Sequence, residues 1–565
     1  MASPSRARRA APTRPRWLYA LIGLVSTLFG VGLAQLLASL FKPSTSPVSA
    51  LGTWVVGVGT EGFMAPVKDW AIEQFGENDK LFLQANVAVG VLVLALVAGL
   101  VARRSWQAGA VVLVLMIAAP VLVLITGPVF GVLDLVPSLV ALVAAVAALW
   151  WLDGLARGTA PAMSVPGRTG GSEKPRAVLS DTPGKDARDT VSSDDPATRP
   201  EREPDAARGP SRRGVLVASA VLTAVAVVAG GAGRFITAAK SKAQKIALPQ
   251  AASGEVPAAL PADLSKTYPG ISPLQVPNAD FYRVDTRLDV PVVDADTWTL
   301  TIDGDVENEF SITFDELLEM EFVERDITLT CVSNTVGGKY VGAARWLGVP
   351  LQTLIDRAKP RDGVDQMLAT DFDGMTIGTP YDLLTDGREA LLCVGMNGEQ
   401  LPREHGFPVR VVIPGLYGFI SATKWVTRLT FTTYKDRESY WTERDWDTRA
   451  PIKPSARIDT PRSAQPIDGK ELLVGGVAWA QFDGGVNKVQ VQLDGGPWTE
   501  ATLGGDVNAV YWRQWYFQVP DALEPGSHSV SARVVDGNGK VQTDVRAQPY
   551  PGGASGIHTL LFRVE

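Results

Sequence analysis

Long apolar runs with few or no charges dominate the N-terminal part of the chain. Each is close to the roughly 20 residues that an α-helix needs to cross a bilayer. The runs are Leu18–Phe41, Leu81–Val101, Ala108–Thr126, Val129–Leu152 and Gly214–Gly233. The first four runs lie close together, and such crowding is far more typical of membrane-spanning helices than of helices buried in a soluble core. The pattern predicts a membrane region over residues 1–152 with four transmembrane helices, and a fifth helix at 214–233.

Arginine residues at the ends of these runs predict an orientation, because Lys and Arg in short flanking segments are retained in the cytoplasm. One cluster, Arg6 to Arg16, precedes the first run; Arg103 and Arg104 close the second, and Arg212 and Arg213 precede the fifth. Five spans with the N-terminus inside place every cluster in the cytoplasm. We therefore expect a multi-pass protein of the cytoplasmic (inner) membrane whose region after about residue 234 is extracytoplasmic.

Residues 153–213 are rich in Pro, Ser, Gly, Asp and Arg and have almost no large apolar side chains. This composition predicts a disordered cytoplasmic linker, because it buries too little surface to offset its ordering entropy. The linker ends in SRRGVLV, residues 211–217. That string resembles a twin-arginine export signal, which serves proteins that fold around a cofactor before export. The alternative is that Arg212 and Arg213 only mark the cytoplasmic end of the fifth helix.

A different pattern, of short alternating and short amphipathic segments, begins near residue 270. Strands are predicted at Trp298–Asp303, Arg325–Cys331 and Val409–Pro414, and helices at Thr313–Met320, capped by Thr313, and Val349–Arg357. This mixture predicts an α+β domain over residues 270–445. From 450 to 565, strand-length segments separated by Asp-Gly and Gly-Asn turns predict a β-sandwich. The fold class is therefore multi-domain, with α-helical membrane segments followed by α+β and all-β parts.

Composition narrows the partners and the chemistry. The net charge of −7 without a basic stripe argues against nucleic acid as a partner. None of the three histidines lies in an apolar run, so the membrane helices are not expected to hold haem. Only two cysteines occur, Cys331 and Cys393. A lone thiol cannot complete a zinc site and there is no CxxC pair. Cys331 is then either a small core residue or a reactive thiolate, and Cys393, in ALLCVGM, is expected to be core.

Several motifs follow Cys331 in a fixed order. They are CVSN (331–334), GAARWLGVPLQTLI (342–355), DFDG (371–374) and MNGEQLPREHGFPVRVVIPGLYGFISATKWVTRL (396–429). This order resembles the molybdopterin-binding domain of the sulfite oxidase family over roughly residues 275–440. The region from SARIDTPRSAQPI (455–467) to SGIHTLLFRV looks like the immunoglobulin-like dimerisation domain of the same family. The resemblance implies an oxidoreductase with a molybdenum-molybdopterin cofactor and a homodimer formed through residues 450–565.

The resemblance also implies roles for single residues. Cys331 matches the one protein ligand of the molybdenum, a task that suits a soft thiolate donor. Arg410 and Lys424 match positions that hold the cofactor, and a guanidinium offers the bidentate geometry that phosphate favours. His405 matches a further cofactor position. The other residues expected at the cofactor are Asn278, Phe281, Tyr282, Asn334 and Asp371, and those expected to be catalytic beside Cys331 are Arg283 and Arg345.

One departure bears on the substrate. Sulfite oxidases proper follow the cysteine motif with paired arginines, one of which helps to bind the anionic substrate; here Thr335 and Val336 occupy that stretch. Sulfite binding should therefore be weakened unless Arg283, Lys339 or Arg345 substitutes. Two enzyme hypotheses follow for the small-molecule substrate: oxidation of sulfite or a related sulfur oxyanion, and reduction of a sulfoxide, as in periplasmic methionine sulfoxide reductases of this fold.

A third hypothesis is a non-catalytic surface-binding protein with a vestigial pocket. The simultaneous presence of Cys331, Arg410 and Lys424 argues against it. No haem-binding domain precedes the molybdenum region, so electrons are expected to pass to a separate electron carrier.

Overall fold

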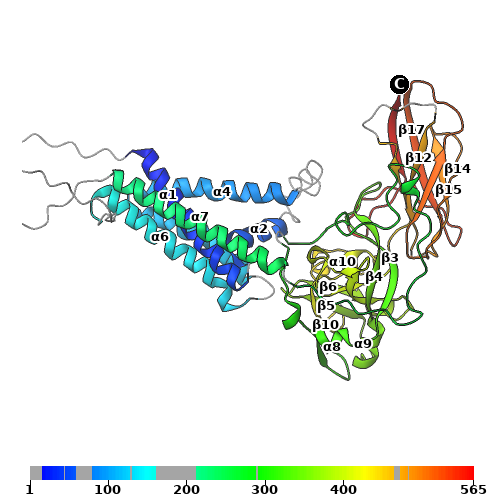
Figure 1. Ribbon diagram of the computed structural model, residues 1–565, viewed down its shortest axis with the longest axis horizontal. Helices are drawn as coiled ribbons and strands as arrows, with labels where there is room; N and C mark the ends of the chain where they lie inside the picture. Colours follow the sequence, from blue (N-terminus) through cyan, green and yellow to red (C-terminus); the bar gives the residue numbers. More distant parts are fainter. Residues whose placement is uncertain are drawn as a thin grey trace, which may run out of the picture. The chain divides into compact units, whose positions relative to one another are not determined.

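A computed structural model describes residues 15–42, 45–58, 79–126, 130–160, 212–242, 244–287, 290–462, 467, 471–481 and 483–565. The predicted linker beyond Ala160 and the arginines Arg6 to Arg14 lie outside the described residues. The described chain divides into two units, one built from the apolar N-terminal region and one made mainly of residues 237–565. Figure 1 shows the helical unit in blue to green and the β-rich unit in green to red.

Helices lie where the apolar runs predicted them. They are α1 (Arg16–Leu40), α4 (Asp79–Ala102), α5 (Trp106–Ile125), α6 (Val136–Arg157), which follows a 3₁₀ turn at Val132–Leu135, and α7 (Arg212–Lys242). A further helix that no apolar run predicted, α2 (Pro47–Val58), lies between the first two runs. Within the described residues, five helical segments are long and apolar enough to cross a membrane. They correspond to the five predicted runs, and α7 continues beyond the predicted end at Gly233.

Helix α6 also continues beyond the point where the linker was expected to begin. The carboxylate of Asp153 is buried and accepts hydrogen bonds from the Tyr19 hydroxyl at 3.1 Å and from Arg157 Nε at 2.6 Å. A buried carboxylate is tolerated when it is paired and hydrogen-bonded in this way. Asp153 therefore fastens α6 to α1 instead of ending the helix, and α6 ends at Arg157 with Gly158 in the left-handed conformation.

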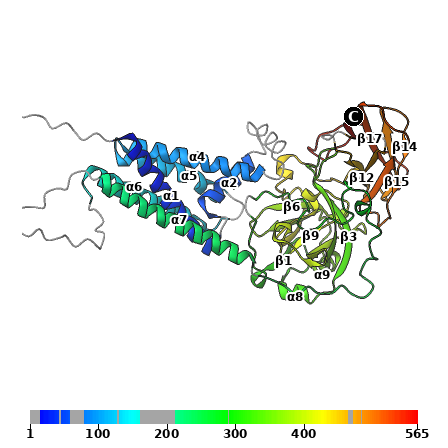
Figure 2. The same ribbon diagram turned by 45° about the horizontal axis from the view of Figure 1, so that its top comes forward.

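One mixed sheet and one antiparallel sheet form the α+β part of the second unit. The first has the order β2 (Phe310–Thr313), β1 (Thr299–Gly304), β10 (Val426–Thr432), β5 (Gln366–Asp371) and β6 (Thr376–Pro380); β1 and β10 are parallel and the other pairs antiparallel. The second has the order β3 (Val323–Thr330), β4 (Val341–Pro350), β7 (Leu391–Met396) and β8 (Glu399–Gln400), with β9 (Arg410–Val412) also paired to β7. Figure 2 shows these strands with the helices around them.

Short helices and turns connect these strands. The α-helices are α8 (Phe314–Leu318), α9 (Leu351–Ala358) and α10 (Gly418–Ser421), and 3₁₀ turns lie at Leu264–Lys266, Ala295–Thr297, Tyr381–Leu383, Arg403–His405 and Thr442–Arg444. The predicted cap on α8 is present, because Thr313 Oγ1 accepts from Glu316 N while the Glu316 carboxylate accepts from Thr313 N. The three predicted strands correspond to β1, β3 and β9, and the predicted helices to α8 and α9.

The C-terminal region forms two four-stranded antiparallel sheets, as its turn pattern predicts. Their orders are β11 (Ser455–Thr460), β12 (Leu473–Trp479), β16 (Arg513–Gln518), β15 (Thr502–Leu503), and β14 (Thr499–Glu500), β13 (Val486–Leu493), β17 (Gly526–Asp536), β18 (His558–Val564). Side chains from both sheets, including Val474, Val489, Trp515 and Phe562, share one core. The two sheets therefore pack as a β-sandwich.

The sandwich also contributes to the core of the α+β part. Trp512 is buried and its indole N–H donates to Leu274 O at 2.7 Å. Thr328, on β3, accepts at its hydroxyl from Trp512 N and at its carbonyl from Gln481 Nε2, at 2.9 and 2.8 Å. Strand β3, which leads to Cys331, is thus held by hydrogen bonds from residues of the sandwich.

Candidate active site

Cys331 directly follows β3 and begins a tight loop that returns to β4. Its backbone N–H donates to Tyr340 O at 3.0 Å, and the Asn334 side chain closes the loop by accepting from Tyr340 N at 2.9 Å. The Cys331 thiol is buried and lies 2.9 Å from the Ser333 hydroxyl. Burial raises the pKa of Cys331, while the hydrogen bonds with Ser333 and the positive charge of Lys424 oppose that rise. The sulfur is thus held in one place and becomes a thiolate readily only when a cation joins it.

The two cysteines are not bridged. Cys331 and Cys393 are both free and both buried. Cys393 lies in the interior of β7 and is fully inaccessible. This environment agrees with the prediction that Cys393 is a core residue.

Arg410 is a buried cation without a recorded carboxylate partner among the described residues. It lies on β9, is 4% exposed, and donates from Nη1 to His405 O at 3.0 Å. Its Nε has no hydrogen-bond partner, and its guanidinium lies 4.9 Å above the ring of Trp346. Burial lowers the pKa of Arg410. A desolvated, uncompensated charge of this kind is costly, so the site is built for an anion that the chain itself does not supply.

Lys424 adds a second cation beside Arg410, because the two residues form a backbone bridge between their segments. Its ammonium donates to Asp285 at 3.2 Å and to Glu404 O at 2.9 Å. Burial, reinforced by the charges of Arg410 and Arg283 and partly offset by Asp285, lowers the pKa of Lys424 to about 8. Arg283 uses the same carboxylate, with its Nε 2.8 Å from Asp285. Arg283 and Lys424 therefore share one recorded acid, and Arg410 has none recorded among the described residues, so positive charge is in excess here.

His405 lies between these cations but does not carry charge itself. Burial, Lys424 and Arg410 lower the pKa of His405 to about 3, so the ring is neutral across the physiological range. Its Nε2 is 3.1 Å from Asn278 O, which assigns the proton to Nε2 as the donor. Gly406, at φ 114°, leaves room here, because a Cβ on it would approach the Cβ atoms of Arg410 and Lys424 at 3.0 and 3.2 Å.

Aromatic rings pack beside these cations. Phe281 stacks on Tyr282 at 5.1 Å between ring centroids, and meets Trp346 and His405 edge to face at 5.9 and 5.4 Å. Burial raises the pKa of Tyr282, so its hydroxyl stays protonated. A cationic cradle beside aromatic walls can bind a flat, polar ligand that carries an anionic group.

Other predicted site residues are engaged in the frame of the pocket. Arg345, on β4, forms a double hydrogen bond with the buried Asp326 on β3, at 2.9 and 2.7 Å. Asp371 accepts from Arg287 at 2.6 Å and from two backbone N–H groups of the following turn. Asn278 donates to Met396 O at 3.2 Å. The recorded contacts of Arg345, Asp371 and Asn278 are structural, and their direct roles stay predictions.

Several residues of the site were not singled out from the sequence. Asp285 is the acid that Arg283 and Lys424 share. Trp425 is buried at φ 53°, an uncommon backbone conformation for a bulky side chain, and its indole donates to Arg403 O at 3.0 Å. Such outliers cluster at functional sites. For Asp285, the nearby Arg283 in FYRVDT was a signal visible in the sequence. No sequence signal indicates the backbone conformation of Trp425.

Comparisons with known proteins agree with this geometry. Residues 287–441 match the family model described as oxidoreductase molybdopterin binding domain. The mitochondrial sulfite oxidase of Macaca fascicularis is 30% identical over 322 residues, and that of Homo sapiens is 29% identical over 321; each match covers 48% of this chain and 58% of the relative. The NADH nitrate reductase of Solanum lycopersicum is 28% identical over 271 residues, covering 38% of this chain and 29% of the relative.

One solved structure also resembles the chain. The crystal structure of the sulfane dehydrogenase SoxCD from Paracoccus pantotrophus matches with a TM-score of 0.45 and 22% identity, covering 52% of this chain and 83% of that one. The chain spans a little over half the length of the mammalian sulfite oxidases that it matches.

Proposed function

We propose that this chain, which carries a molybdopterin-binding oxidoreductase domain of the sulfite oxidase family, is a membrane-anchored molybdenum enzyme that catalyses two-electron oxygen-atom transfer. The observation that carries the proposal is the buried, uncompensated guanidinium of Arg410, which lies with Lys424 and Arg283 in one pocket. Those cations fit the phosphate of a molybdopterin. The ring of Tyr282, packed against Phe281 and the buried Trp346 behind it, would fit its flat pterin, and Cys331 would supply a thiolate for the metal.

The protein groups have distinct tasks in this proposal. When bound, the molybdenum cofactor supplies a two-electron redox centre for oxygen-atom transfer. Cys331 would hold the metal as a thiolate after losing its proton, and the Ser333 hydroxyl would fix the direction of the sulfur. His405 contributes a neutral hydrogen-bonding ring, so it does not add to the repulsion between Arg410 and Lys424. The residues of the chain would therefore bind and orient the cofactor, and the cofactor would supply the redox chemistry.

The lowered pKa of Lys424 predicts proton-linked binding of the cofactor. The folded, cofactor-free protein loses this proton near pH 8, well below the usual value of 10.5. The anion needs charged Lys424, so affinity for molybdopterin should fall as the pH rises above about 8, by up to roughly tenfold per unit. Between about pH 8 and the usual lysine pKa of 10.5, Lys424 keeps its proton in the unfolded chain but loses it in the folded protein. The free energy of unfolding of the cofactor-free protein should therefore rise as the pH rises through this range. Equilibrium cofactor binding at pH 7 to 10 checks the sign, and Lys424→Arg should remove the pH dependence. Affinity that is flat or rises with pH in the wild type would contradict it.

We extend the proposal to a multi-pass anchor in the cytoplasmic membrane, with the oxidoreductase domain on its extracytoplasmic side. Arg16 at the start of α1, Arg104 at the α4–α5 turn, Arg157 at the end of α6 and Arg212 at the start of α7 would then share the cytoplasmic face. The arginine pair at the start of α7 is compatible with twin-arginine export of a folded, cofactor-loaded domain. These arginine positions support the orientation.

Reporter fusions test this orientation. Alkaline phosphatase, which is active only outside the cytoplasm, should be active when fused after Leu248 and inactive when fused after Thr159. Green fluorescent protein, which folds in the cytoplasm, should show the opposite pattern. Phosphatase activity at Thr159 without activity at Leu248 would reverse the proposed topology.

The proposal includes two partners. The sandwich of residues 455–564 is interpreted as an immunoglobulin-like dimerisation domain, which would make the enzyme a homodimer. The chain has three histidines, of which His405 lies in the pocket and His528 and His558 in the sandwich. The membrane helices thus lack the histidine pair of a haem site, so electrons are proposed to pass to a separate carrier.

Sulfite and sulfoxides are the two candidate substrates. Thr335 and Val336 replace the paired arginines of sulfite oxidases, and Arg283 and Arg345 are already paired with Asp285 and Asp326. This specific observation favours sulfoxide reduction over sulfite oxidation. The full chain, purified in detergent from a host that makes the cofactor, should contain molybdenum and should turn over one of these substrates with artificial electron carriers. A folded chain without molybdenum would overturn the proposal and revive the non-catalytic binding hypothesis.

A further inference from the structure

A narrow cavity opens beside the Cys331 loop, between the oxidoreductase domain and the sandwich. Its interior volume is about 20 Å³, and the space that includes its open mouth is about 300 Å³. One wall carries Thr335 and Val336, the stretch that holds paired arginines in sulfite oxidases proper. The lining also includes Tyr417, Lys453, Trp479 and Ser555. The sandwich side thus provides half of a pocket next to the proposed metal ligand.

Tyr417 lines this cavity together with Thr330, which directly precedes Cys331, and Asn334 of the same loop. A tyrosine hydroxyl carries its proton at neutral pH and can donate it in a hydrogen bond. The ring is covered by Gly553, which has φ 90° and where any Cβ would fall on the Tyr417 ring. The hydroxyl accepts a long hydrogen bond from the backbone N–H of Lys453, at 3.4 Å. Tyr417 and Lys453 are therefore immediate neighbours in the cavity.

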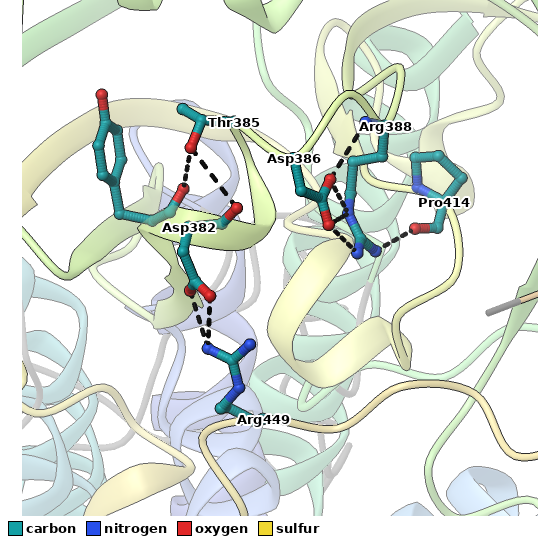
Figure 3. A network of polar contacts seen from close by, with 7 residues as sticks. Asp382, Thr385, Asp386, Arg388, Pro414 and Arg449 are labelled. Carbon is teal, nitrogen blue, oxygen red and sulfur yellow. Dashed lines mark hydrogen bonds and ion pairs between the residues drawn. The ribbon is translucent and has the colours of Figure 1, made fainter. Parts of the chain in front are cut away.

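The two segments that carry these residues are held rigidly together. Tyr417 N donates to Ala450 O at 3.1 Å and Ile452 N to Gly415 O at 3.0 Å. Figure 3 shows two arginines that fix the ends of the segments: Arg388 Nη1 donates to Pro414 O at 2.9 Å, and Arg449 pairs with Asp382 at 2.8 Å. Lys453 is thus placed by backbone pairing and not by a flexible loop.

Lys453 is the cation that lines the cavity, among the described residues. Its ammonium donates to the carbonyl of Gly553, and no carboxylate partner is recorded for it in the described part of the chain. Arg283 and Arg345, by contrast, are each paired with an aspartate. The remaining polar groups of the cavity are hydroxyls, on Thr335, Tyr417 and Ser555.

We propose that Lys453 is the substrate-recognising cation of this enzyme, and that it acts with the Tyr417 hydroxyl to select small sulfur-oxygen compounds with no more than one negative charge. This inference rests on the proposed function and names the substrate class for the same site. One ammonium compensates one charge, whereas a dianion would leave a second charge unpaired in a partly buried pocket. Val336 and Trp479 offer apolar surface to a small organic substituent, which sulfite does not have.

Equilibrium binding to the full chain in detergent tests the inference without turnover. The probes are methanesulfonate, a monoanion with one methyl group, and sulfate, a dianion, titrated calorimetrically. The wild type should bind methanesulfonate more tightly than sulfate, and Lys453→Met should weaken methanesulfonate binding by roughly tenfold or more. Lys488→Met is the matched control, because Lys488 is exposed on β13, paired with Glu500 at 2.9 Å, and should leave binding unchanged.

Kinetics on molybdenum-loaded enzyme give the second readout. Lys453→Met should raise KM for a monoanionic substrate by roughly tenfold with little change in kcat, because the ammonium binds ground state and transition state alike. Tyr417→Phe should lower kcat instead. Tighter binding of sulfate than methanesulfonate, or an unchanged affinity and KM in Lys453→Met, would overturn the inference. Absence of molybdenum from the wild type would overturn the proposed function, while the binding titration would still decide the role of Lys453.

Discussion

Replacing Cys331 with alanine is expected to lower turnover by about a thousandfold or more, a loss of roughly 4 kcal/mol in transition-state stabilisation. The proposed metal would lose its protein ligand. The pterin should be retained, because Arg410, Lys424 and the aromatic wall are untouched by the substitution. The measurements are kcat with artificial electron carriers and the pterin content of the purified chain.

Cys393 provides the matched control. It is the other buried thiol of the chain, inside β7, so Cys393→Ala removes the same atoms from a core position. That variant should lose about 1 kcal/mol of unfolding free energy, a typical cost for a single core change. Its turnover per folded molecule should match the wild type. Equal loss of activity in both variants, or full activity in Cys331→Ala, would contradict the assignment.

Replacing Arg410 with methionine is expected to have opposite effects on cofactor content and on the stability of the cofactor-free protein. Cofactor content should fall by at least about tenfold, because a charge-assisted contact to phosphate is lost. The cofactor-free variant should be as stable as the wild type or more stable, because a buried guanidinium without a recorded carboxylate is replaced by an apolar chain. Molybdenum and pterin analysis and thermal unfolding of cofactor-free samples measure the two effects.

Replacing Arg345 is expected to change the stability of the cofactor-free protein in the opposite direction from replacing Arg410. Arg345→Met would leave Asp326, whose side chain is 1% exposed, without its cation. Removing one partner of a buried pair typically costs about 3 to 5 kcal/mol. If Arg410→Met destabilised the cofactor-free protein as strongly as Arg345→Met, then Arg410 would be a structural residue and the anion site would lose its main support.

The features that could be predicted from the sequence are those that depend on a local pattern of residues. The five apolar helices follow from length and hydropathy, and the start of α8 follows from the Thr313 and Glu316 cap. The resemblance of the motifs around Cys331 to the molybdopterin-binding domain is confirmed by the family model over residues 287–441. Cys393 in the core was also correctly predicted from the apolar run around it.

The features that could not be predicted from the sequence depend on contacts between distant segments. The pairing of Arg345 with Asp326 depends on the register of β3 and β4, which the sequence does not reveal, and a catalytic role for Arg345 stays a prediction. Lys453 has no signal in the sequence, because backbone pairing between the segments around Leu416 and Pro451 brings it to the cavity near Cys331. The neutral state of His405 depends on burial beside two cations, which composition cannot report. The end of α6 was misplaced for the same reason, since Asp153 is satisfied by Tyr19 from another helix.

X-ray absorption at the molybdenum edge of the purified full chain tests the central claim most directly, with Cys331→Ala measured beside the wild type. The account predicts bound molybdenum in the wild type and one sulfur ligand fewer in the variant. Absence of molybdenum from the folded wild type, or the same number of sulfur ligands in both proteins, would contradict it.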